Sequence, residues 1–386
     1  MQIMRLFSKP KLLTLALICM ISVWSSGGNQ QRNAQELPPR QSTTGPYPPA
    51  GVDTFGQEFP RAQALSAMLI PNAPAYLWYN GCGPTAVGMV LGYYAGHGFS
   101  RLFPGDANSQ ANYMNNAISS LENYADYCYP LDYKPNLLPD KSEPPFGDEH
   151  KDNCIADFMR TSQSHIQNYY GWSWDTDIEP AFGKYVALVS PYVCFAQRYS
   201  YDSFSFESLK SEINNGRPLV LLVDSDGDGA TDHFVTVISF NSAAGIDYYG
   251  CYNTWDWSVH YYPYRTIAKG QAWGVYSVHT LLLLEAIYPP KDFSLQRVTS
   301  NFVFFKEYIN RLNWKTDERN SSLPVRYRLY RKAQAAADET YERIGEFERT
   351  VLNYDDRGMK KNERYIYRIT SVESMGRESD PMIISD

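Results

Sequence analysis

Three absences narrow the classes of protein to which this sequence can belong. The 386 residues carry a net charge of −7 without a long basic run, so the chain lacks the electrostatic footprint of a nucleic-acid-binding protein. Its six cysteines include no Cys-x-x-Cys spacing and its six histidines no metal-binding spacing, which argues against zinc. The apolar run of residues 12–24 is too short to span a membrane comfortably.

The N-terminal 28 residues have the pattern of a secretory signal peptide. Basic residues precede the apolar run of residues 12–24, and small residues at 25–28 supply a cleavage site. A lipoprotein anchored through Cys19 and a retained N-terminal anchor are the alternatives. We therefore expect a protein that is secreted, periplasmic or displayed at the cell surface, with no membrane contact beyond such an anchor.

Composition changes divide the rest of the chain into three parts. Residues 29–60 are rich in Pro, Gln, Ser and Thr and predict a flexible linker or pro-segment. Residues 61–288 begin with helical patterns and continue with strands, and Pro289-Pro290 marks the start of a second unit. The expected helices are residues 112–124, 153–170 and 204–214, and the expected strands of this part are residues 192–196, 218–223 and 234–240.

Cys82 is the strongest candidate for a reactive residue. It lies between two glycines and directly before the helical stretch of residues 87–94. Free N–H groups and the helix dipole stabilise a thiolate at a helix N-terminus. His233 follows 151 residues later and Asn253 another 20 residues on. The three side chains can supply a nucleophile, a base and a residue that orients the base.

These residues carry a resemblance to papain-like cysteine peptidases of the bacteriocin-processing, peptidase C39-like branch. The shared motifs are the Asn-Gly-Cys-Gly-Pro-Thr-Ala run around Cys82, the Asp-His-Phe-Val strand at His233 and the Asn-Thr-Trp turn at Asn253. The resemblance implies a two-lobed α+β fold with the active site in the cleft between the lobes. It also implies peptide hydrolysis through a thioester, shielding of the His–Asn bond by Trp255, and no organic cofactor.

One part of the family pattern is missing. Papain-like enzymes place a glutamine six residues before the cysteine, where its amide completes the oxyanion hole, and this chain has Tyr76 there. The hydroxyl of Tyr76 and the amide of Asn80 are chemically capable replacements. The departure keeps open a second interpretation, in which the fold persists and catalysis is weak or lost.

An acidic loop precedes the histidine. Asp224, Asp226 and Asp228 alternate and are followed by Gly229, which matches the beginning of a calcium-binding loop. Val235 stands where an EF-hand has its bidentate glutamate, and Asp232 is the available substitute. We expect a structural calcium site, with a solvated Asp/Gly turn as the alternative.

Four cysteines remain after Cys19 and Cys82 are set aside. In an exported chain they predict two disulfides, with three possible connectivities. Cys128 and Cys154 share one irregular region, which favours a Cys128–Cys154 bond and leaves Cys194 to pair with Cys251.

Residues 289–386 resemble a fibronectin type III domain over their whole length. The motifs that carry the resemblance are residues 312–314, 327–331, 365–372 and 376–379. Strands are expected at residues 301–305, 309–314, 325–331, 341–345, 364–372 and 382–384, which would form an all-β antiparallel sandwich. Such domains are usually spacers or adhesion modules, so contact with a cell surface or glycan is the expected role.

The sequence therefore predicts a secreted cysteine peptidase that acts on a peptide or protein substrate. Two alternatives remain: an inactive papain-like binding or adhesion protein, and a transglutaminase-like amide-transfer enzyme, which could use the same three residues.

Overall fold

The computed structural model describes residues 45–59, 68–120, 152–162, 170–337 and 340–386. The predicted signal peptide, the lipoprotein cysteine Cys19 and Cys128 lie outside these residues. Among the described residues, none of the helices has the length and apolar character needed to cross a membrane.

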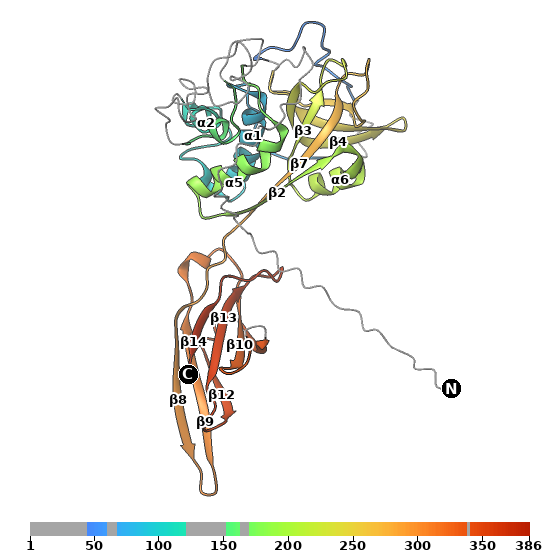
Figure 1. Cartoon of the computed structure of the whole chain (residues 1–386). Helices are drawn as coiled ribbons and strands as arrows, with labels where there is room; N and C mark the ends of the chain where they lie inside the picture. Colours follow the sequence, from blue (N-terminus) through green and yellow to red (C-terminus); the bar gives the residue numbers. More distant parts are fainter. Residues whose placement is uncertain (1–44, 60–67, 121–151, 163–169, 338–339) are drawn as a thin grey trace, which may run out of the picture. The chain divides into compact units, whose positions relative to one another are not determined.

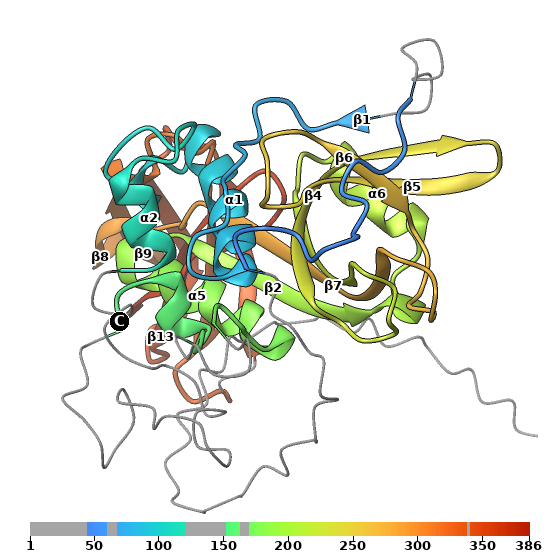
Figure 2. The same ribbon diagram turned by 90° about the horizontal axis from the view of Figure 1, so that it is seen from above.

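Helix α1 (Cys82–Gly96) is the central helix of the first part of the chain. Thirteen of its fifteen residues are buried, as expected of a helix that is apolar on all sides. Gly83 allows its close packing, because a Cβ there would lie 2.7 Å from Met159 Cε and 3.3 Å from Phe234 Cδ2. The Thr236 hydroxyl donates to the Ala86 carbonyl at 3.0 Å and ties the helix to a neighbouring strand. Figures 1 and 2 show α1 between the β-sheet of this part of the chain and helix α2 (Asn112–Ile118).

The sheet beside α1 is antiparallel throughout and has the strand order β2-β7-β3-β4-β5-β6, with β1 paired to β4. The central strands β3 and β4 contain near-continuous apolar runs because both of their faces are covered. The seven strands are β1 (Met68–Leu69), β2 (Val193–Ser200), β3 (Leu219–Asp224), β4 (His233–Ala243), β5 (Ile246–Tyr252), β6 (His260–Pro263) and β7 (Gly274–Leu284).

The remaining helices agree only in part with the sequence-based prediction. Helix α6 (Phe206–Asn214) is confirmed, and the Ser205 hydroxyl caps it by accepting from the Ser208 N–H. Helices α2 (Asn112–Ile118) and α4 (Ile155–Phe158) are shorter than predicted. Helix α4 cannot continue through Arg160, because the φ of 50° at this residue is incompatible with a helix. Helix α5 (Ile178–Val189) was missed.

Residues 45–59, the described part of the segment predicted as a flexible linker or pro-segment, make main-chain hydrogen bonds to the sheet. The Tyr262 hydroxyl donates to the Thr54 carbonyl at 2.6 Å, and the Trp273 indole donates to the Asp53 carbonyl at 2.8 Å. The Gln57 N–H donates to the Tyr261 carbonyl at 2.8 Å. These main-chain contacts depend little on side-chain identity, which is why the composition did not reveal them.

Residues 289–386 form two antiparallel sheets, of three strands (β12-β9-β8) and four strands (β11-β10-β13-β14). Leu312 and Trp314 from the first sheet share one core with Tyr327, Leu329 and Tyr367 from the second, which makes the unit a sandwich. The strands are β8 (Lys291–Asn301), β9 (Lys306–Lys315), β10 (Arg326–Ala333), β11 (Glu342–Phe347), β12 (Asn353–Met359), β13 (Tyr365–Val372) and β14 (Met382–Ser385). The strand predicted at residues 301–305 is wrong: Asn301 ends β8, and residues 302–305 form the turn between β8 and β9.

Candidate active site

The backbone before α1 presents Cys82 as the first residue of the helix. Gly81 precedes it with a φ of 146°, and a Cβ at that position would lie 2.9 Å from Pro84 Cδ and 3.0 Å from the Gly171 carbonyl oxygen. Only glycine fits this conformation and this space. The Thr85 hydroxyl donates to the Gly81 carbonyl at 2.7 Å and accepts from the Tyr79 N–H at 3.0 Å, which fixes the turn.

His233 begins strand β4 and is fully buried. Its Nε2 lies 2.7 Å from the main-chain carbonyl oxygen of Asn253. A carbonyl only accepts, so Nε2 carries the proton and the lone pair of the neutral ring is on Nδ1. The ring is stacked on Trp255, with the ring centroids 4.2 Å apart and 9° between the planes.

The side chain of Asn253 forms hydrogen bonds with Trp255 and Tyr262, whereas the sequence predicted that it orients His233. Its Oδ1 accepts from the Trp255 N–H at 3.1 Å, and its Nδ2 donates to the Tyr262 hydroxyl at 3.5 Å. The side chain therefore closes the turn that carries Trp255, while the main chain of Asn253 meets the imidazole.

Cys82 lies at the same end of β4 as His233. Main-chain N–H groups of Phe234, Gly83 and Cys82 are directed at the sulfur and favour the thiolate. Burial outweighs them and, with the nearby Asp232 carboxylate, raises the pKa of the Cys82 thiol to about 11. Burial lowers the pKa of His233 to about 4, opposed by the hydrogen bond to the Asn253 carbonyl. At neutral pH the structure thus contains an uncharged thiol and an uncharged imidazole.

The two predicted oxyanion donors have other partners. The Tyr76 hydroxyl donates to the Ala107 carbonyl and lies against Gly92, ten residues along α1 from Cys82. At 1.5 Å per residue this is about 15 Å from the start of the helix, so the Tyr76 prediction is wrong. The Asn80 amide donates to the Ser119 hydroxyl at 3.2 Å, and its oxygen accepts from the Tyr170 hydroxyl.

A donor that sequence analysis missed lies nearer to the nucleophile. The indole N–H of Trp78 is buried and has no hydrogen-bond acceptor among the described residues. A Cβ on Gly171 would lie 2.7 Å from Trp78 Cζ2 and 3.0 Å from Gly81 Cα, so the indole lies close to the residue that precedes Cys82. An aromatic residue four positions before a cysteine gives no sequence signal of this role.

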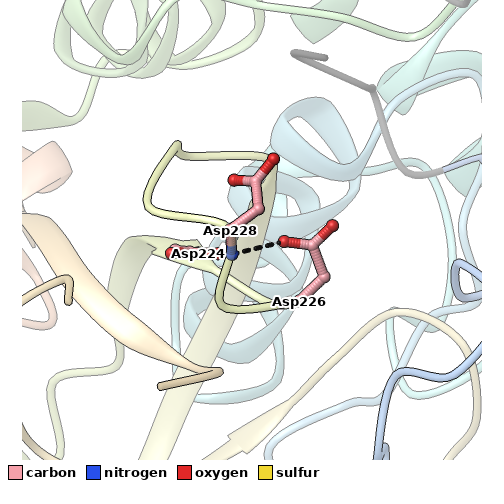
Figure 3. Close-up of side chains that lie close together, drawn as sticks. All are labelled: Asp224, Asp226 and Asp228. Carbon is pink, nitrogen blue, oxygen red and sulfur yellow. Dashed lines mark hydrogen bonds between the residues drawn. The ribbon is translucent and has the colours of Figure 1, made fainter. Parts of the chain in front are cut away.

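The acidic loop between β3 and β4 brings three of the four predicted metal ligands together. Oxygens of Asp224, Asp226 and Asp228 lie within 4.8 Å of one another (Figure 3). Asp224 accepts from the N–H groups of Gly227 at 2.7 Å and Gly229 at 2.8 Å, which shapes the loop around it. This set of carboxylates is suited to a hard divalent cation such as calcium.

Asp232 does not belong to this cluster. Its carboxylate accepts from the main-chain N–H of Ser225 at 2.7 Å and from the Ser225 hydroxyl at 2.6 Å. Burial raises the pKa of Asp232 to about 7. It closes the base of the loop next to His233.

A second histidine joins a helix to the sheet. His279 on β7 is buried, and its Nδ1 lies 2.6 Å from Glu179 Oε1 on α5, while its Nε2 lies 3.0 Å from the Ser277 hydroxyl. The sequence predicted a strand residue and did not predict these partners. Ser277 is also fully buried, so the cluster stabilises the fold instead of offering a nucleophile.

The predicted Cys194–Cys251 disulfide is contradicted by the structure, and the predicted Cys128–Cys154 disulfide involves a residue outside the described ones. Cys251 on β5 is a buried free thiol, and three strands separate it from β2, which carries Cys194. Cys154 is likewise a buried free thiol, and its predicted partner Cys128 lies outside the described residues. Cys194 and Cys251 were paired only because they remained after Cys128 and Cys154, and the order of strands in the sheet keeps them apart.

The model of the Peptidase_C39 like family matches residues 59–277. No curated protein matches the chain. Similar solved structures include an FN3tt mutant (19% identity, 26% of this chain and 92% of that chain, TM-score 0.20) and an FN3 domain of human collagen XX (17%, 27% and 95%, 0.20). The twitchin kinase region of C. elegans is 13% identical with a TM-score of 0.21, and the match covers 26% of this chain and 16% of that one.

Proposed function

This chain belongs to the Peptidase_C39 like family, and on that premise we propose that it is a cysteine peptidase. The nucleophile is Cys82, the base is His233, and the residue that orients the base is Asn253. The observation that carries the proposal is the arrangement of His233, which is held by the Asn253 carbonyl and stacked on Trp255 at the end of β4 that meets Cys82.

The reaction proceeds by acyl transfer. Cys82 Sγ attacks the substrate carbonyl carbon while His233 Nδ1 takes the thiol proton, which gives a tetrahedral oxyanion. The C–N bond then breaks, the proton passes to the leaving amine, and a thioester remains on the sulfur. Water hydrolyses the thioester with His233 again as base. Because both groups begin uncharged, proton transfer accompanies the attack.

The oxyanion requires donors, and two are proposed. The Cys82 N–H at the start of α1 is one, and the Trp78 indole N–H, which has no acceptor among the described residues, is the second. In this role Trp78 replaces the glutamine that the related enzymes use, and Tyr76 has no part in catalysis.

The wider assignment follows the same proposal. Residues 61–288 form the two-lobed papain-like peptidase domain, and residues 289–386 form a fibronectin type III-like domain that contacts a cell surface or glycan. Residues 1–28 direct export, so the substrate is an extracellular or periplasmic peptide or protein. Calcium at Asp224, Asp226 and Asp228 stabilises the loop that leads to His233.

The test combines labelling and product analysis on the purified chain. The wild type should react with an iodoacetamide or epoxysuccinyl probe at Cys82 and cleave members of a proteome-derived peptide library, and Cys82→Ala should do neither. Labelling without cleavage of any peptide would favour the inactive binding protein. Products that carry an added primary amine in place of water would favour amide transfer. Undiminished cleavage by Cys82→Ala would exclude the assigned nucleophile.

A further inference from the structure

The turn between β8 and β9 exposes four consecutive apolar side chains. Phe302, Val303, Phe304 and Phe305 are 51%, 90%, 96% and 61% exposed, respectively. None of them belongs to the core of the sandwich. An apolar run of this kind is normally buried in a strand, so its position at a turn calls for a partner outside the domain.

The turn is ordered and projects beyond its neighbours. The Phe302 N–H donates to the Phe305 carbonyl at 2.9 Å, and the two rings are stacked with centroids 4.6 Å apart. Pairing of β9 with β12 ends at Tyr308 and Met359, so the tip of the hairpin has no strand beside it on that side (Figure 1). The result is a narrow convex projection with Val303 and Phe304 at its apex.

Basic residues surround the base of the projection. Lys306 begins β9, and Lys360 and Lys361 follow Met359, which pairs with Tyr308. The guanidinium of Arg297 on β8 donates to the Lys360 carbonyl at 2.6 Å and holds this second turn beside the hairpin. The nearby Glu307 is neutralised by Arg357 at 3.2 Å. Lys306 and Lys361 form no ion pair among the described residues.

We propose that residues 302–305 insert into the interface of a lipid bilayer that contains anionic lipids, with Lys306 and Lys361 on the headgroups, while Lys360 is paired with Glu363 at 3.1 Å. A convex apolar tip enters a fluid bilayer without a complementary pocket, whereas a protein partner would have to supply one. Aromatic side chains favour the headgroup region, and lysines beside it are attracted to anionic lipids. The turn penetrates only to interfacial depth, because its main-chain polar groups need hydration.

This inference does not depend on the proposed peptidase activity, and it departs from the sequence interpretation, which expected no membrane contact beyond an N-terminal anchor. It gives the C-terminal domain a specific ligand, an anionic membrane surface. Attachment by one short loop is weak, so binding should be reversible and sensitive to salt.

Vesicle flotation of the full chain tests the proposal. Wild type should float with vesicles of phosphatidylcholine and phosphatidylglycerol, and high salt should weaken this binding. Phe304→Ser should reduce binding at least tenfold without changing the melting temperature, because the side chain is 96% exposed. Met375→Ser is the matched control, since Met375 is 85% exposed in a different turn of the same domain, and it should bind like wild type.

Charge reversal separates the two contributions. Lys306→Glu combined with Lys361→Glu should reduce binding to anionic vesicles more than to pure phosphatidylcholine vesicles. Failure of the wild type to bind either vesicle would overturn the proposal and point to a protein partner for the hairpin. Equal binding by wild type and Phe304→Ser would overturn it as well.

Discussion

The imidazole of His233 lies parallel to the indole of Trp255, with 4.2 Å between the ring centroids. The indole N–H of Trp255 in turn donates to the Gly45 carbonyl at 3.2 Å, and the ring packs against Trp273. The plane of the proposed base is therefore set by an aromatic ring that is itself held on two sides.

Replacement of this aromatic ring should lower turnover. Trp255→Leu removes the stack, which is worth about 0.5–1.5 kcal/mol, so kcat/KM should fall roughly 2- to 12-fold. Trp255→Phe keeps an aromatic face and should retain most of the activity. Steady-state kinetics on one peptide substrate measures both variants. Equal loss in the two variants would show that the indole N–H bond to Gly45, and not stacking, is the important contact.

Loss of the Asn253 side chain should lower kcat less than loss of a catalytic side chain. Asn253→Ala keeps the main-chain carbonyl that lies 2.7 Å from His233 Nε2 and loses the side-chain bonds to the Trp255 N–H and the Tyr262 hydroxyl. We expect a loss of about 1 kcal/mol in unfolding free energy and less than about tenfold in kcat. His233→Ala should abolish turnover.

Asn253→Ser is the matched control, because its hydroxyl can still accept from the Trp255 N–H, and it should recover the lost stability. If Asn253→Ala proved as inactive as His233→Ala, the side chain and not the carbonyl would orient the imidazole.

The Trp78 indole offers a clean test of the oxyanion donor. Trp78→Phe keeps the aromatic ring and removes the N–H, so kcat should fall by about 10²-fold or more. Alkylation of Cys82 by iodoacetamide forms no oxyanion, and its rate should stay unchanged. Tyr76→Phe is the comparison and should keep wild-type turnover, because the Tyr76 hydroxyl bonds to the Ala107 carbonyl. A fully active Trp78→Phe enzyme would remove Trp78 from the site.

Local sequence patterns predicted helices and strands correctly where a pattern had only one interpretation. Apolar runs predicted β3 and β4, and the pattern of residues 204–214 predicted α6. The run at residues 301–305 failed because hydrophobicity alone cannot distinguish a buried strand from an exposed turn. Helix α5 was missed because its apolar end was read as the beginning of the strands.

The site was predictable in its residue types and not in its contacts. The Gly-Cys-Gly-Pro run and the helix start identify Cys82 from the sequence. The role of the Asn253 main chain could not be predicted, because every residue has a carbonyl. Tyr76 lies away from the site because it packs against Gly92 of α1, the helix that begins at Cys82. Only the three-dimensional structure shows this contact.

The reactivity of Cys82 should depend steeply on pH. With a thiol pKa raised to about 11 by burial, the alkylation rate should rise almost tenfold per pH unit between 7 and 10. A thiolate–imidazolium pair would instead give a nearly constant rate in this range. Asp232→Asn removes a negative charge that raises this pKa, so alkylation at pH 8 should become faster. Mass spectrometry of the labelled peptide measures the rate at Cys82 alone.

The raised pKa of Cys82 also makes the free energy of unfolding depend on pH. The folded-state pKa of Cys82 lies above the ordinary thiol value of about 9, so the buried thiol stabilises the fold below pH 9. This contribution is lost as the pH rises from 9 to about 11, because the unfolded chain releases its proton first. Cys82→Ser should therefore lose less stability than wild type over this interval in urea unfolding.

Calcium should stabilise the chain through the loop that leads into β4. Carboxylate oxygens of Asp224, Asp226 and Asp228 lie within 4.8 Å of one another, so their negative charges repel. A bound cation removes their mutual repulsion, and the stabilisation is about 2.7 kcal/mol when free calcium is 100 times the Kd. Without a bidentate glutamate, we expect a Kd of about 10⁻⁴ to 10⁻³ M.

Thermal unfolding in chelator and in about 10 mM calcium, well above this Kd, measures the effect. Asp226→Asn should abolish the calcium-dependent rise in melting temperature, because it removes a ligand charge and keeps an oxygen that can accept from the Asp228 N–H. Asp202→Asn, at an exposed position in another turn, is the control and should respond like wild type. An identical melting curve in chelator and calcium would leave the loop as an acidic turn, shaped only by the hydrogen bonds from Gly227 and Gly229 to Asp224.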